Sequence, residues 1–509
     1  MKYDYIVVGA GSAGATIATR LSENPEISVL LLEAGPDYPE IEQLPPEVKF
    51  GYGSNIDIWT SSHNWQFTGK STDFAPEPMR VPRGKVTGGT SAINAQMFIR
   101  GIPEDYDNWG IAGNNQWDYK QCLPYFRKLE NDLDYSDDFH GNEGPMVARR
   151  WQPSDWNPDQ EAFYNSCRDF GFPDCHDHNN PDTTGVGSLA FNNIDGVRWS
   201  TSIAYLGLGR HRLNLTIKPN SHAHKLIINN HRAEGVQVES GGEVFNVYGD
   251  EIILSSGSIG SPQLLMLSGI GPATHLEELG IDVLLDLPGV GKNLRDHPNV
   301  WIDWNVKEKY LDVQDKIEPF SQMALRYTAT GSDLENDMCV LMASKNRDIR
   351  GIIRMIGVIN LALSEGSIRL ASSNPNQQPI LNYNFLDHPE DKRRLRETVR
   401  ICVELGENAK FSEIVDKLRS PDLTILNDDK LLDDWMMRTV TTGHHIAGTC
   451  KMGSSSDDMA VVDQFANIYG IQGLRVVDAS IMPDCPRANT NVTTIMIAER
   501  ISDFIKNSK

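Results

Sequence analysis

The chain has 509 residues, of which 39% are hydrophobic and 23% are charged, and its formal net charge at pH 7 is −22. This size exceeds what one hydrophobic core usually serves, so we expect two domains in a globular, water-soluble protein. The negative charge argues against nucleic acids and anionic membranes as partners. No apolar run is long enough to span a bilayer, and the first strand begins almost at residue 1, so we expect no signal peptide, no membrane insertion and a cytoplasmic location.

Residues 4–35 predict a β-α-β unit that binds a dinucleotide. An apolar strand leads into three glycines with G-x-G-x-x-G spacing, an amphipathic helix follows, and a second apolar strand ends in Glu33. The glycines permit a tight turn, close approach to a pyrophosphate and close packing of helix on strand, while Glu33 can accept hydrogen bonds from an adenosine ribose. This pattern does not separate NAD from FAD. The residues expected to contact the dinucleotide are Gly9, Gly11, Ser12, Ala13, Gly14, Glu33 and Ala34.

The next segments are rich in residues that favour turns. Residues 36–75 contain many Pro, Gly, Asn and Trp residues and predict a long irregular segment, for which the role of a lid is open. Residues 88–94 form a turn of small residues. This turn is either purely structural or lets the backbone approach a flat ring, with Ser91 and Asn94 as hydrogen-bond donors.

The seven cysteines are scattered, which predicts no disulfide framework. The run from Cys175 to His178 contains two histidines and an aspartate, but no second ligand pair follows at zinc spacing. Because Asp, Asn and Pro surround this run, we interpret it as a polar loop and expect no metal site.

The rest of the chain alternates between two kinds of pattern. Residues 215–297 alternate strand and turn signals, 298–440 combine further strand patterns with helical stretches at 389–408 and 428–439, and 441–509 return to Gly-rich turns, a strand and a final helix. We therefore expect a nucleotide-binding domain made of residues 1–150, 215–297 and 441–509. A substrate domain of residues 151–214 and 298–440 would be inserted between these pieces.

The C-terminal segment carries the residues that suit chemistry. His444 and His445 precede a Gly-Thr turn, and a histidine is a natural general base near neutral pH, although a structural histidine is the alternative. Asp478 ends a strand, where it could bind ribityl hydroxyls or orient the backbone near a pyrophosphate. Residues 489–491, Asn-Thr-Asn, begin the last helix; they can cap it, and a helix start directed at a flavin would stabilise the negative charge formed on reduction.

Taken together and in this order, GAGSAG, GGTSAIN, GSPQLLMLSGIGP, HxxGTCKMG and VVDASIMPxxxxxNTN resemble the glucose–methanol–choline (GMC) family of FAD-dependent oxidoreductases. The match spans nearly the whole chain, is loose over 298–440, and looks most like the bacterial members that act on small alcohols, such as hydroxymethylfurfural and choline oxidases. The resemblance implies an α/β fold of two domains: a Rossmann-like FAD-binding domain and an inserted substrate domain built on an antiparallel sheet flanked by helices.

The same resemblance implies the site residues. It places the catalytic base on His445 and the second residue of the catalytic pair on Asn491, and it places His444 at the substrate pocket or behind the pair. Some members link FAD covalently through a histidine in the first Gly-rich loop; this chain has Ile93 and Asn94 there, which implies non-covalent FAD. The remaining residues implied to bind FAD are Gly88, Gly89, Ser91, Asn94, Ala95, Ala223, Asp478, Ala479, Asn491 and Thr493.

The implied reaction is the oxidation of an alcohol, expected to be a primary alcohol on a small polar molecule, by hydride transfer to flavin N5 with His445 as the base. The electron acceptor would be O₂ or an organic or protein acceptor; Gly443 disfavours rapid use of oxygen, because some oxidases of the family carry an apolar side chain there. Two alternatives stay open on the same fold: a hydroxynitrile lyase that holds FAD without redox chemistry, and a binding module that keeps FAD for structure. The sequence does not identify the substrate.

Overall fold

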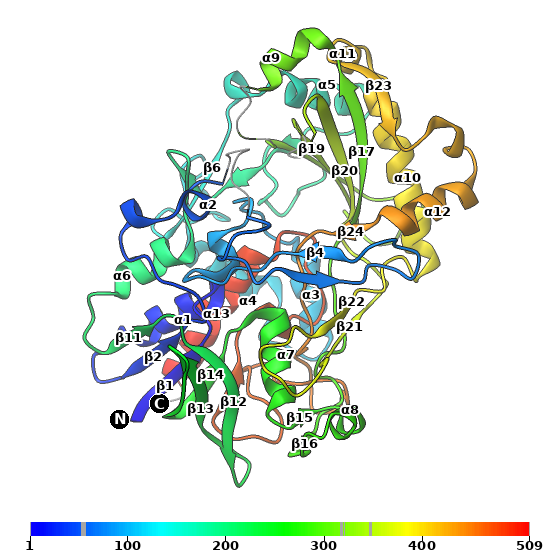
Figure 1. The fold of residues 1–509 in the computed structure, drawn as a ribbon. Coiled ribbons are helices and arrows are strands. Elements are labelled where there is room, and N and C mark those ends of the chain that lie inside the picture. The colour runs from blue at the N-terminus through cyan, green and yellow to red at the C-terminus, as the bar shows by residue number, and fades with distance from the viewer. Residues whose placement is uncertain (1, 52–57, 316–318, 320, 346–348, 508–509) are drawn as a thin grey trace.

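The computed structural model describes residues 2–51, 58–315, 319, 321–345 and 349–507. It contains two seven-stranded sheets, one in the lower half and one in the upper half of Figure 1, with helices packed against each. This arrangement confirms the expected α/β fold of two parts. No helix among the described residues is long and apolar enough to cross a membrane.

The first sheet is built around the predicted β-α-β unit. Its strands follow the order β11-β2-β1-β14-β13-β12, and β25 pairs with the carboxyl-terminal end of β14. Strands β11, β2, β1, β14 and β25 run parallel to one another, whereas β13 is antiparallel to both β14 and β12. Their bounds are β1 (Lys2–Val8), β2 (Val29–Leu32), β11 (Leu215–Lys218), β12 (His222–Asn229), β13 (Arg232–Ser240), β14 (Glu243–Leu254) and β25 (Leu474–Val476).

Three helices position the carboxyl ends of these strands. α1 (Ser12–Leu21) follows β1 directly, and α13 (Thr490–Asn507) packs along α1 although it lies at the other end of the chain. α7 (Gly257–Leu267) follows β14 in the same way that α1 follows β1. Because parallel strands end at the same edge, the turns after β1, β2 and β14 meet there.

The second sheet is antiparallel, in the order β23-β17-β20-β19-β18-β7, with β24 paired to β17. α10 (Pro389–Gly406) and α5 (Pro158–Phe170) pack against it, and α10 and α12 (Asp429–Thr439) confirm the two predicted helical stretches. The strands are β7 (Gly185–Ser188), β17 (Pro298–Val306), β18 (Met323–Tyr327), β19 (Met338–Ala343), β20 (Ile352–Ile359), β23 (Val415–Ser420) and β24 (Thr441–Thr442).

Short elements connect the two sheets. The described part of segment 36–75, expected to be irregular, contains only α2 (Pro46–Lys49) and β3 (Phe67–Gly69) beside one 3₁₀ turn. Residues 52–57 of this segment lie outside the described residues, and its role as a lid stays open. The remaining elements are β4 (Met79–Val81), α3 (Pro103–Ile111), α4 (Tyr119–Leu129), β5 (Glu130–Asp132), β6 (Met146–Arg150), β8 (Ala190–Phe191), β9 (Asn193–Ile194), β10 (Val197–Arg198), α6 (Gly207–Gly209), β15 (Ile270–Gly271), α8 (Ala273–Glu278), β16 (Leu285–Asp286), α9 (Leu311–Gln314), β21 (Ser367–Arg369), β22 (Ile380–Asn382) and α11 (Ala409–Ser412).

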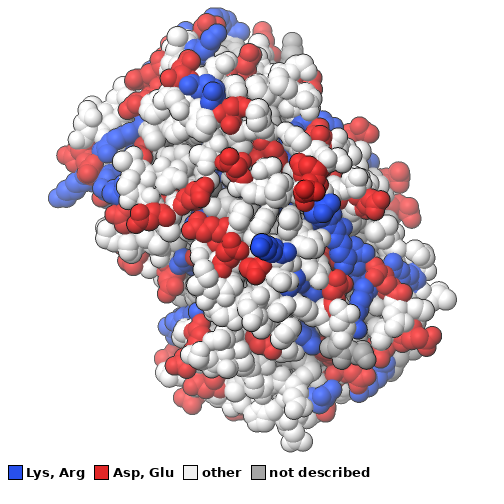
Figure 2. Space-filling model, turned by 180° about the vertical axis from the view of Figure 1, so that it is seen from behind, with Lys and Arg blue, Asp and Glu red and all other residues white. Residues whose placement is uncertain are grey.

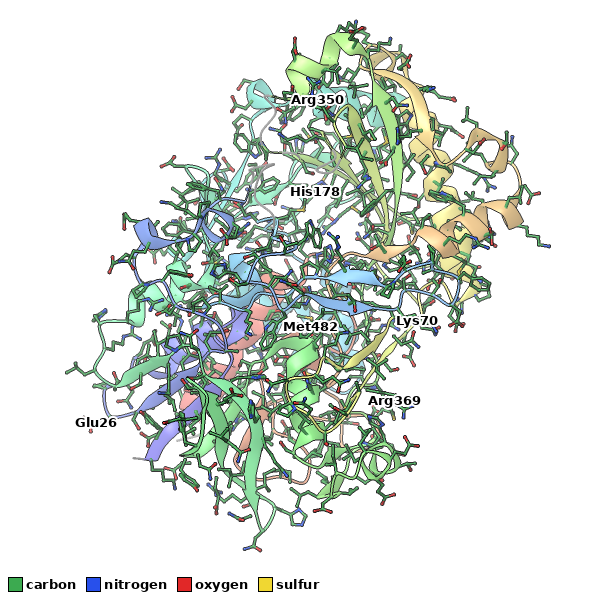
Figure 3. The ribbon with its side chains drawn as sticks, viewed as in Figure 1. Glu26, Lys70, His178, Arg350, Arg369 and Met482 are labelled. Carbon is green, nitrogen blue, oxygen red and sulfur yellow. The ribbon has the colours of Figure 1, made fainter. Side chains whose placement is uncertain are left out.

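The Cys175–His178 run is part of the packed structure. His178 is buried near the second sheet (Figure 3), and its Nε2 lies 3.3 Å from the carbonyl oxygen of Gly187 and 3.2 Å from that of Ala324. Burial lowers the pKa of His178 to about 4, so the neutral ring bridges β7 and β18 by donating from Nε2. On the back of the molecule, acidic and basic side chains intermingle, and some of the basic ones form a short band right of centre (Figure 2).

A buried cluster of six charges ties the connecting segments together. His140 lies 3.1 Å from Asp132 and 3.0 Å from Asp177, and two buried arginines complete the ion pairs, Arg100 with Glu130 and Arg150 with Asp132 and Asp177. Glu130, Asp132 and His140 are close enough to hold a metal ion, but Arg100 and Arg150 already form ion pairs with the two carboxylates. Although burial opposes it, hydrogen bonding to Asp132, Asp177 and Glu130 raises the pKa of His140 to about 11. The cluster is therefore neutral with His140 protonated.

Replacing His140 by Gln is expected to destabilise the protein by about 3–5 kcal/mol near pH 6, because it leaves buried carboxylates without their cation. A histidine whose pKa is raised in the folded state stabilises the protein fully at a pH below its unfolded-state pKa of 6.5. This stabilisation is lost as the pH rises through the folded-state pKa of about 11. The difference in the free energy of unfolding between wild type and H140Q, measured in urea, should therefore become smaller from pH 6 to pH 10. H176Q, at an exposed histidine paired with Asp174, is the matched control and should not shift the urea midpoint; a constant gap would contradict the charged state of His140.

Candidate active site

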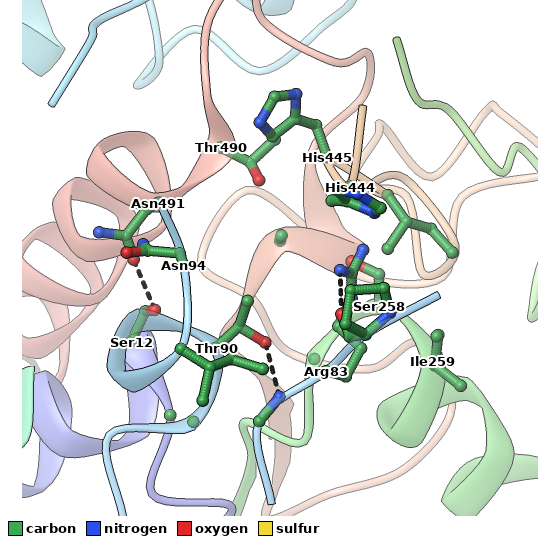
Figure 4. A pocket seen from close by; sticks show the side chains of 18 of the residues that line it. Ser12, Arg83, Thr90, Asn94, Ser258, Ile259, His444, His445, Thr490 and Asn491 are labelled. Atoms are coloured by element: carbon green, nitrogen blue, oxygen red, sulfur yellow. Dashed lines mark hydrogen bonds between the residues drawn. The ribbon is translucent and has the colours of Figure 1, made fainter. Parts of the chain in front are cut away.

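A cavity of about 620 Å³ lies between the two sheets and is lined by residues of both. Its lower part is formed by the turns at the carboxyl ends of β1, β2 and β14, and its upper part by one face of the second sheet. Figure 4 shows side chains from these turns and from the C-terminal segments around it. A cavity of this size suits an organic cofactor together with a small substrate.

The first glycine turn has the geometry of a phosphate-binding loop. Gly9 has φ +99°, and a Cβ there would lie 2.5 Å from the Ser255 carbonyl oxygen; a Cβ on Gly14 would lie 1.8 Å from the Gly9 oxygen. These two glycines are required by the fold itself. At Gly11, by contrast, the nearest atom to a Cβ would be 3.8 Å away, so the space beside it is free for a ligand.

Other predicted contacts of this unit also face the cavity. Ser12, Ala13 and Ala34 line it, and so does Glu33 at the end of β2. The Glu33 carboxylate accepts hydrogen bonds from the backbone N–H groups of Ala10 (2.9 Å) and Gly35 (2.8 Å). Burial nevertheless raises its pKa to about 7.

The second glycine turn approaches the first closely, but only some of its residues line the cavity. A Cβ on Gly89 would lie 2.6 Å from the Gly11 Cα, so the two turns touch. Gly89, Asn94 and Ala95 line the cavity, as predicted. Gly88 and Ser91 do not: the Ser91 hydroxyl donates to the Gly88 carbonyl oxygen (2.6 Å) and contacts Thr201, so it is not available to a flavin.

Of the predicted C-terminal residues, too, only some line the cavity. Asp478 and Ala479 line the cavity, but the Asp478 carboxylate already accepts from Ser261 Oγ (2.6 Å) and from the Gly257 N–H (2.9 Å) at the start of α7. It thus orients backbone, which was one of its two expected roles. The expected contact of Thr493 is not found, because its hydroxyl is buried against Tyr106 (2.9 Å); Thr494 lines the cavity instead. Ala223 lines the cavity at its nucleotide end.

The structure corrects the expected catalytic pair. Asn489, not Asn491, contacts His445: the Asn489 amide nitrogen lies 2.8 Å from His445 Nε2. Asn491 accepts a hydrogen bond from Ser12 Oγ (2.7 Å) at the first glycine turn, apart from His445 (Figure 4). Because Asn491 lies two residues later, at the beginning of α13, it points toward α1.

A second histidine contacts His445 from the other side. His297 Nδ1 lies 2.9 Å from His445 Nδ1, and His297 Nε2 lies 3.0 Å from the Pro486 carbonyl oxygen. A carbonyl oxygen only accepts, so His297 Nε2 carries the hydrogen and, in the neutral ring, Nδ1 is the acceptor. His445 must then donate from Nδ1, so the lone pair of its Nε2 accepts from the Asn489 amide. A substrate hydroxyl that is to reach this lone pair must take the place of that amide.

The backbone around His445 is held by the segment that carries His297. The Asp296 carboxylate accepts from the His445 N–H (2.9 Å) and from the Thr442 hydroxyl, and Gly443 donates to the His297 carbonyl oxygen (2.8 Å). A Cβ on Gly443 would lie 3.0 Å from His297 Cβ and 3.1 Å from His445 Nδ1. Glycine at this position therefore makes room for the contact between the two histidines.

Both histidines are neutral at pH 7. Burial lowers the pKa of His297 to about 4, and burial together with His297, His444 and Arg83 lowers the pKa of His445 well below its usual value. His444 lines the cavity with φ +66° and lies with its ring centre 5.9 Å from that of Trp59.

Several lining residues were not predicted from the sequence. They include Arg83, Thr90 and the backbone run from Ser255 to Gly260, which starts α7 in the same way that residues 9–14 start α1. The GSPQ stretch after β14 was the available signal, because it also places small residues after a strand. Asn489 and His297 lie 44 and 148 residues from His445, and no local pattern connects them.

The chain is similar to known proteins over nearly its whole length. Two family models, both described as GMC oxidoreductase, match residues 3–299 and 362–498. The oxygen-dependent choline dehydrogenase of Vibrio vulnificus is 34% identical over 535 aligned residues, which cover 99% of this chain and 94% of that protein. Among solved structures, pyridoxine 4-oxidase from Mesorbium loti aligns with a TM-score of 0.92 at 27% identity over 99% of both chains, and a formate oxidase with 0.89 at 25% identity over 100% and 98%.

Proposed function

The chain belongs to the GMC oxidoreductase family, and from this membership we propose that it uses FAD to oxidise a primary alcohol to an aldehyde. The observation that carries the proposal is the lone pair of His445 Nε2, which faces the cavity beside the Asn489 amide and is fixed there by His297. A neutral imidazole held in one tautomer is what removal of a hydroxyl proton requires.

The residues around the lower part of the cavity fit FAD. The open space beside Gly11, the unpaired N–H groups at the start of α1 and the Glu33 carboxylate suit a pyrophosphate and a ribose. Several residues that line the cavity have a buried polar atom without a hydrogen-bond partner among the described residues, including Ser258 (Oγ) and Asn491 (Nδ2). Polar atoms in such positions call for a polar ligand.

When bound, FAD supplies the two-electron acceptor for the oxidation. His445 Nε2 takes the hydroxyl proton of the alcohol, and the new imidazolium keeps its Nδ1 hydrogen bond to His297. The Asn489 amide, which contacts His445 Nε2 in the structure, would turn to donate to the substrate oxygen and so position the hydroxyl beside the base. The low pKa of His445 keeps the base unprotonated at neutral pH, so it is ready before the substrate binds.

FAD is proposed to be bound without a covalent link. Residues 88–97 contain no histidine, cysteine or tyrosine, and Ile93 and Asn94 line the cavity there. Acid precipitation of the purified protein should therefore release all the yellow colour into the supernatant, where mass spectrometry should find intact FAD. A yellow pellet would contradict this proposal, and denaturation in guanidinium followed by gel filtration is the independent check.

Oxygen is the acceptor that we propose, because the Vibrio vulnificus relative is named as oxygen-dependent. The function as a whole is tested by mixing the purified yellow protein with alcohols in the absence of air and following the long-wavelength flavin absorbance. Bleaching by an alcohol supports the proposal, and rapid return of colour in air identifies an oxidase. A flavin that dithionite bleaches but no alcohol does would contradict it, and release of cyanide from a cyanohydrin would then indicate a lyase.

A further inference from the structure

The wall that the second sheet contributes to the cavity is mostly apolar. Side chains alternate between the two faces of a strand, so every second residue of neighbouring strands meets the cavity. In this face Val358 pairs across the sheet with Asn299 on one side and Cys339 on the other, and Ile356 pairs with Trp301 and Leu341. The cavity-lining residues of this face are Asn299, Trp301, Ala324, Arg326, Cys339, Leu341, Ile356 and Val358. Met97, Ile99 and Leu189 extend the apolar surface.

The tryptophan rings around the cavity already carry cations. Aromatic faces are the usual neutral sites for a quaternary ammonium group. Here, however, the guanidinium of Arg354 lies 3.8 Å from the centre of the Trp301 ring, Lys85 lies 4.6 Å from that of Trp65, and Arg80 lies 6.0 Å from that of Trp59. These are all the tryptophans among the described lining residues.

The carboxylates of the cavity are engaged as well. Among the described lining residues these are Glu33 and Asp478 at the nucleotide end, both bonded to backbone N–H groups, and Glu47, which pairs with His63 (2.9 Å). The nearest acid on the sheet face is Asp303, one pair of residues beyond Trp301. Arg354 binds both of its oxygens, at 2.7 and 2.9 Å.

One buried arginine of this wall, Arg326, has no ion-pair partner among the described residues. Arg326 is 3% exposed, and its guanidinium donates only to neutral oxygens, among them the carbonyls of Arg487 (2.8 Å) and His178 (3.0 Å). In the described part of the chain its hydrogen bonds go to three carbonyl oxygens and the Thr183 hydroxyl, and none goes to a carboxylate. A buried positive charge without a direct ion-pair partner at this place disfavours a second cation in the cavity, although Asp105 and Asp177 act on Arg326 from a longer distance.

We infer that the substrate is an alcohol with an uncharged, apolar tail, and that choline and other quaternary ammonium alcohols are not substrates. The inference rests on the proposed oxidation of an alcohol, and it goes against transferring the substrate of the choline dehydrogenase relatives to this chain. The hydroxyl group meets His445 and Asn489, while the tail packs against Leu341, Ile356 and Val358.

The decisive experiment compares two alcohols of the same shape. Choline and 3,3-dimethylbutan-1-ol differ in having a quaternary nitrogen or a quaternary carbon, and 3-hydroxy-2,2-dimethylpropanoate adds an anionic member to the set. Each is mixed with the holoenzyme without air, and the second-order rate constant of flavin bleaching is measured. The uncharged alcohol should bleach at least about 100-fold faster than choline, because the cation would lose its hydration without gaining a partner.

The outcomes separate the inference from the proposed function. Faster bleaching by choline or by the anionic alcohol would overturn the inference and leave alcohol oxidation standing. If none of these alcohols, nor benzyl alcohol nor hexan-1-ol, bleaches a flavin that dithionite reduces, the proposed function fails and the inference falls with it.

A pair of variants tests the inference without relying on the wild-type ranking. Arg354→Ala would uncover the Trp301 ring and free the Asp303 carboxylate, which together make a site for a cation at the mouth of the cavity. Its rate constant with choline should rise, and a tetramethylammonium titration should show binding that the wild type lacks. Arg350→Ala breaks a similar arginine–carboxylate pair, with Asp315 on the surface, and should change neither. An Arg354→Ala protein that binds tetramethylammonium no better than wild type would overturn the inference.

Discussion

Replacing His445 by Ala is expected to slow bleaching of the flavin by an alcohol about 10²–10⁴-fold, while the bound FAD and its spectrum stay unchanged. The cavity then keeps its cofactor-binding turns but loses the lone pair that takes the hydroxyl proton. His445 Nε2 is the acceptor that lies against the Asn489 amide and is fixed as an acceptor by the hydrogen bond of His445 to His297. Stopped-flow absorbance without air measures the reduction step directly.

The two asparagines near α13 provide matched variants for this prediction. Asn489→Ala removes the amide that contacts His445 and should slow bleaching, whereas Asn491→Ala breaks the hydrogen bond to Ser12 and should mainly weaken binding of FAD. The dissociation constant of FAD and the bleaching rate therefore separate the two roles. Slow bleaching of a fully loaded Asn491→Ala protein, with Asn489→Ala near wild type, would contradict the assignment from the structure and restore the one from the sequence.

The first β-α-β unit of the first sheet was predictable, because its signals are local. The strand, the glycine spacing and the following helix are adjacent in residues 4–35, and each has a physical requirement that few residues meet. The close approach of Gly14 to the Gly9 oxygen is one example. Helices α10 and α12 were equally readable from their periodicity. The pairing of β7 with β18 was not, because it joins residues more than a hundred positions apart in sequence.

The sequence predicts which segments form the site better than it predicts which residues of each segment face the cavity. The sequence correctly brings the Gly88 turn, the His445 turn and the start of α13 to one cavity, but it does not say which side chain of each turn faces inward. Ser91 and Thr493 point away, into contacts with Thr201 and Tyr106. The choice between Asn489 and Asn491 depends on where α13 begins, and helix boundaries are the least certain feature of a sequence pattern.

His297 is the residue that no pattern connected with catalysis, and its replacement gives the second large effect. His297→Leu should slow flavin bleaching about 10- to 100-fold with little change in the KM for the alcohol. The reason is the tautomer: without an acceptor opposite Nδ1, the His445 hydrogen is free to move to Nε2, where it blocks the base. If His297 had only a structural role, its replacement would instead lower the stability of the protein and change the KM for the alcohol and the turnover rate alike.

His297→Asn separates the two explanations, because its side-chain oxygen can accept a hydrogen bond near the position of the histidine Nδ1 while the ring is lost. If His297 acts by holding the tautomer of His445, His297→Asn should recover much of the bleaching rate that His297→Leu loses. In ¹⁵N-labelled protein, the His445 Nε2 signal should be that of a nitrogen without hydrogen in the wild type and in His297→Asn. In His297→Leu it should shift toward a hydrogen-bearing nitrogen. Equal rates in both variants, or an unchanged Nε2 signal in His297→Leu, would show that His445 keeps its tautomer without His297 and that the contact only fills space.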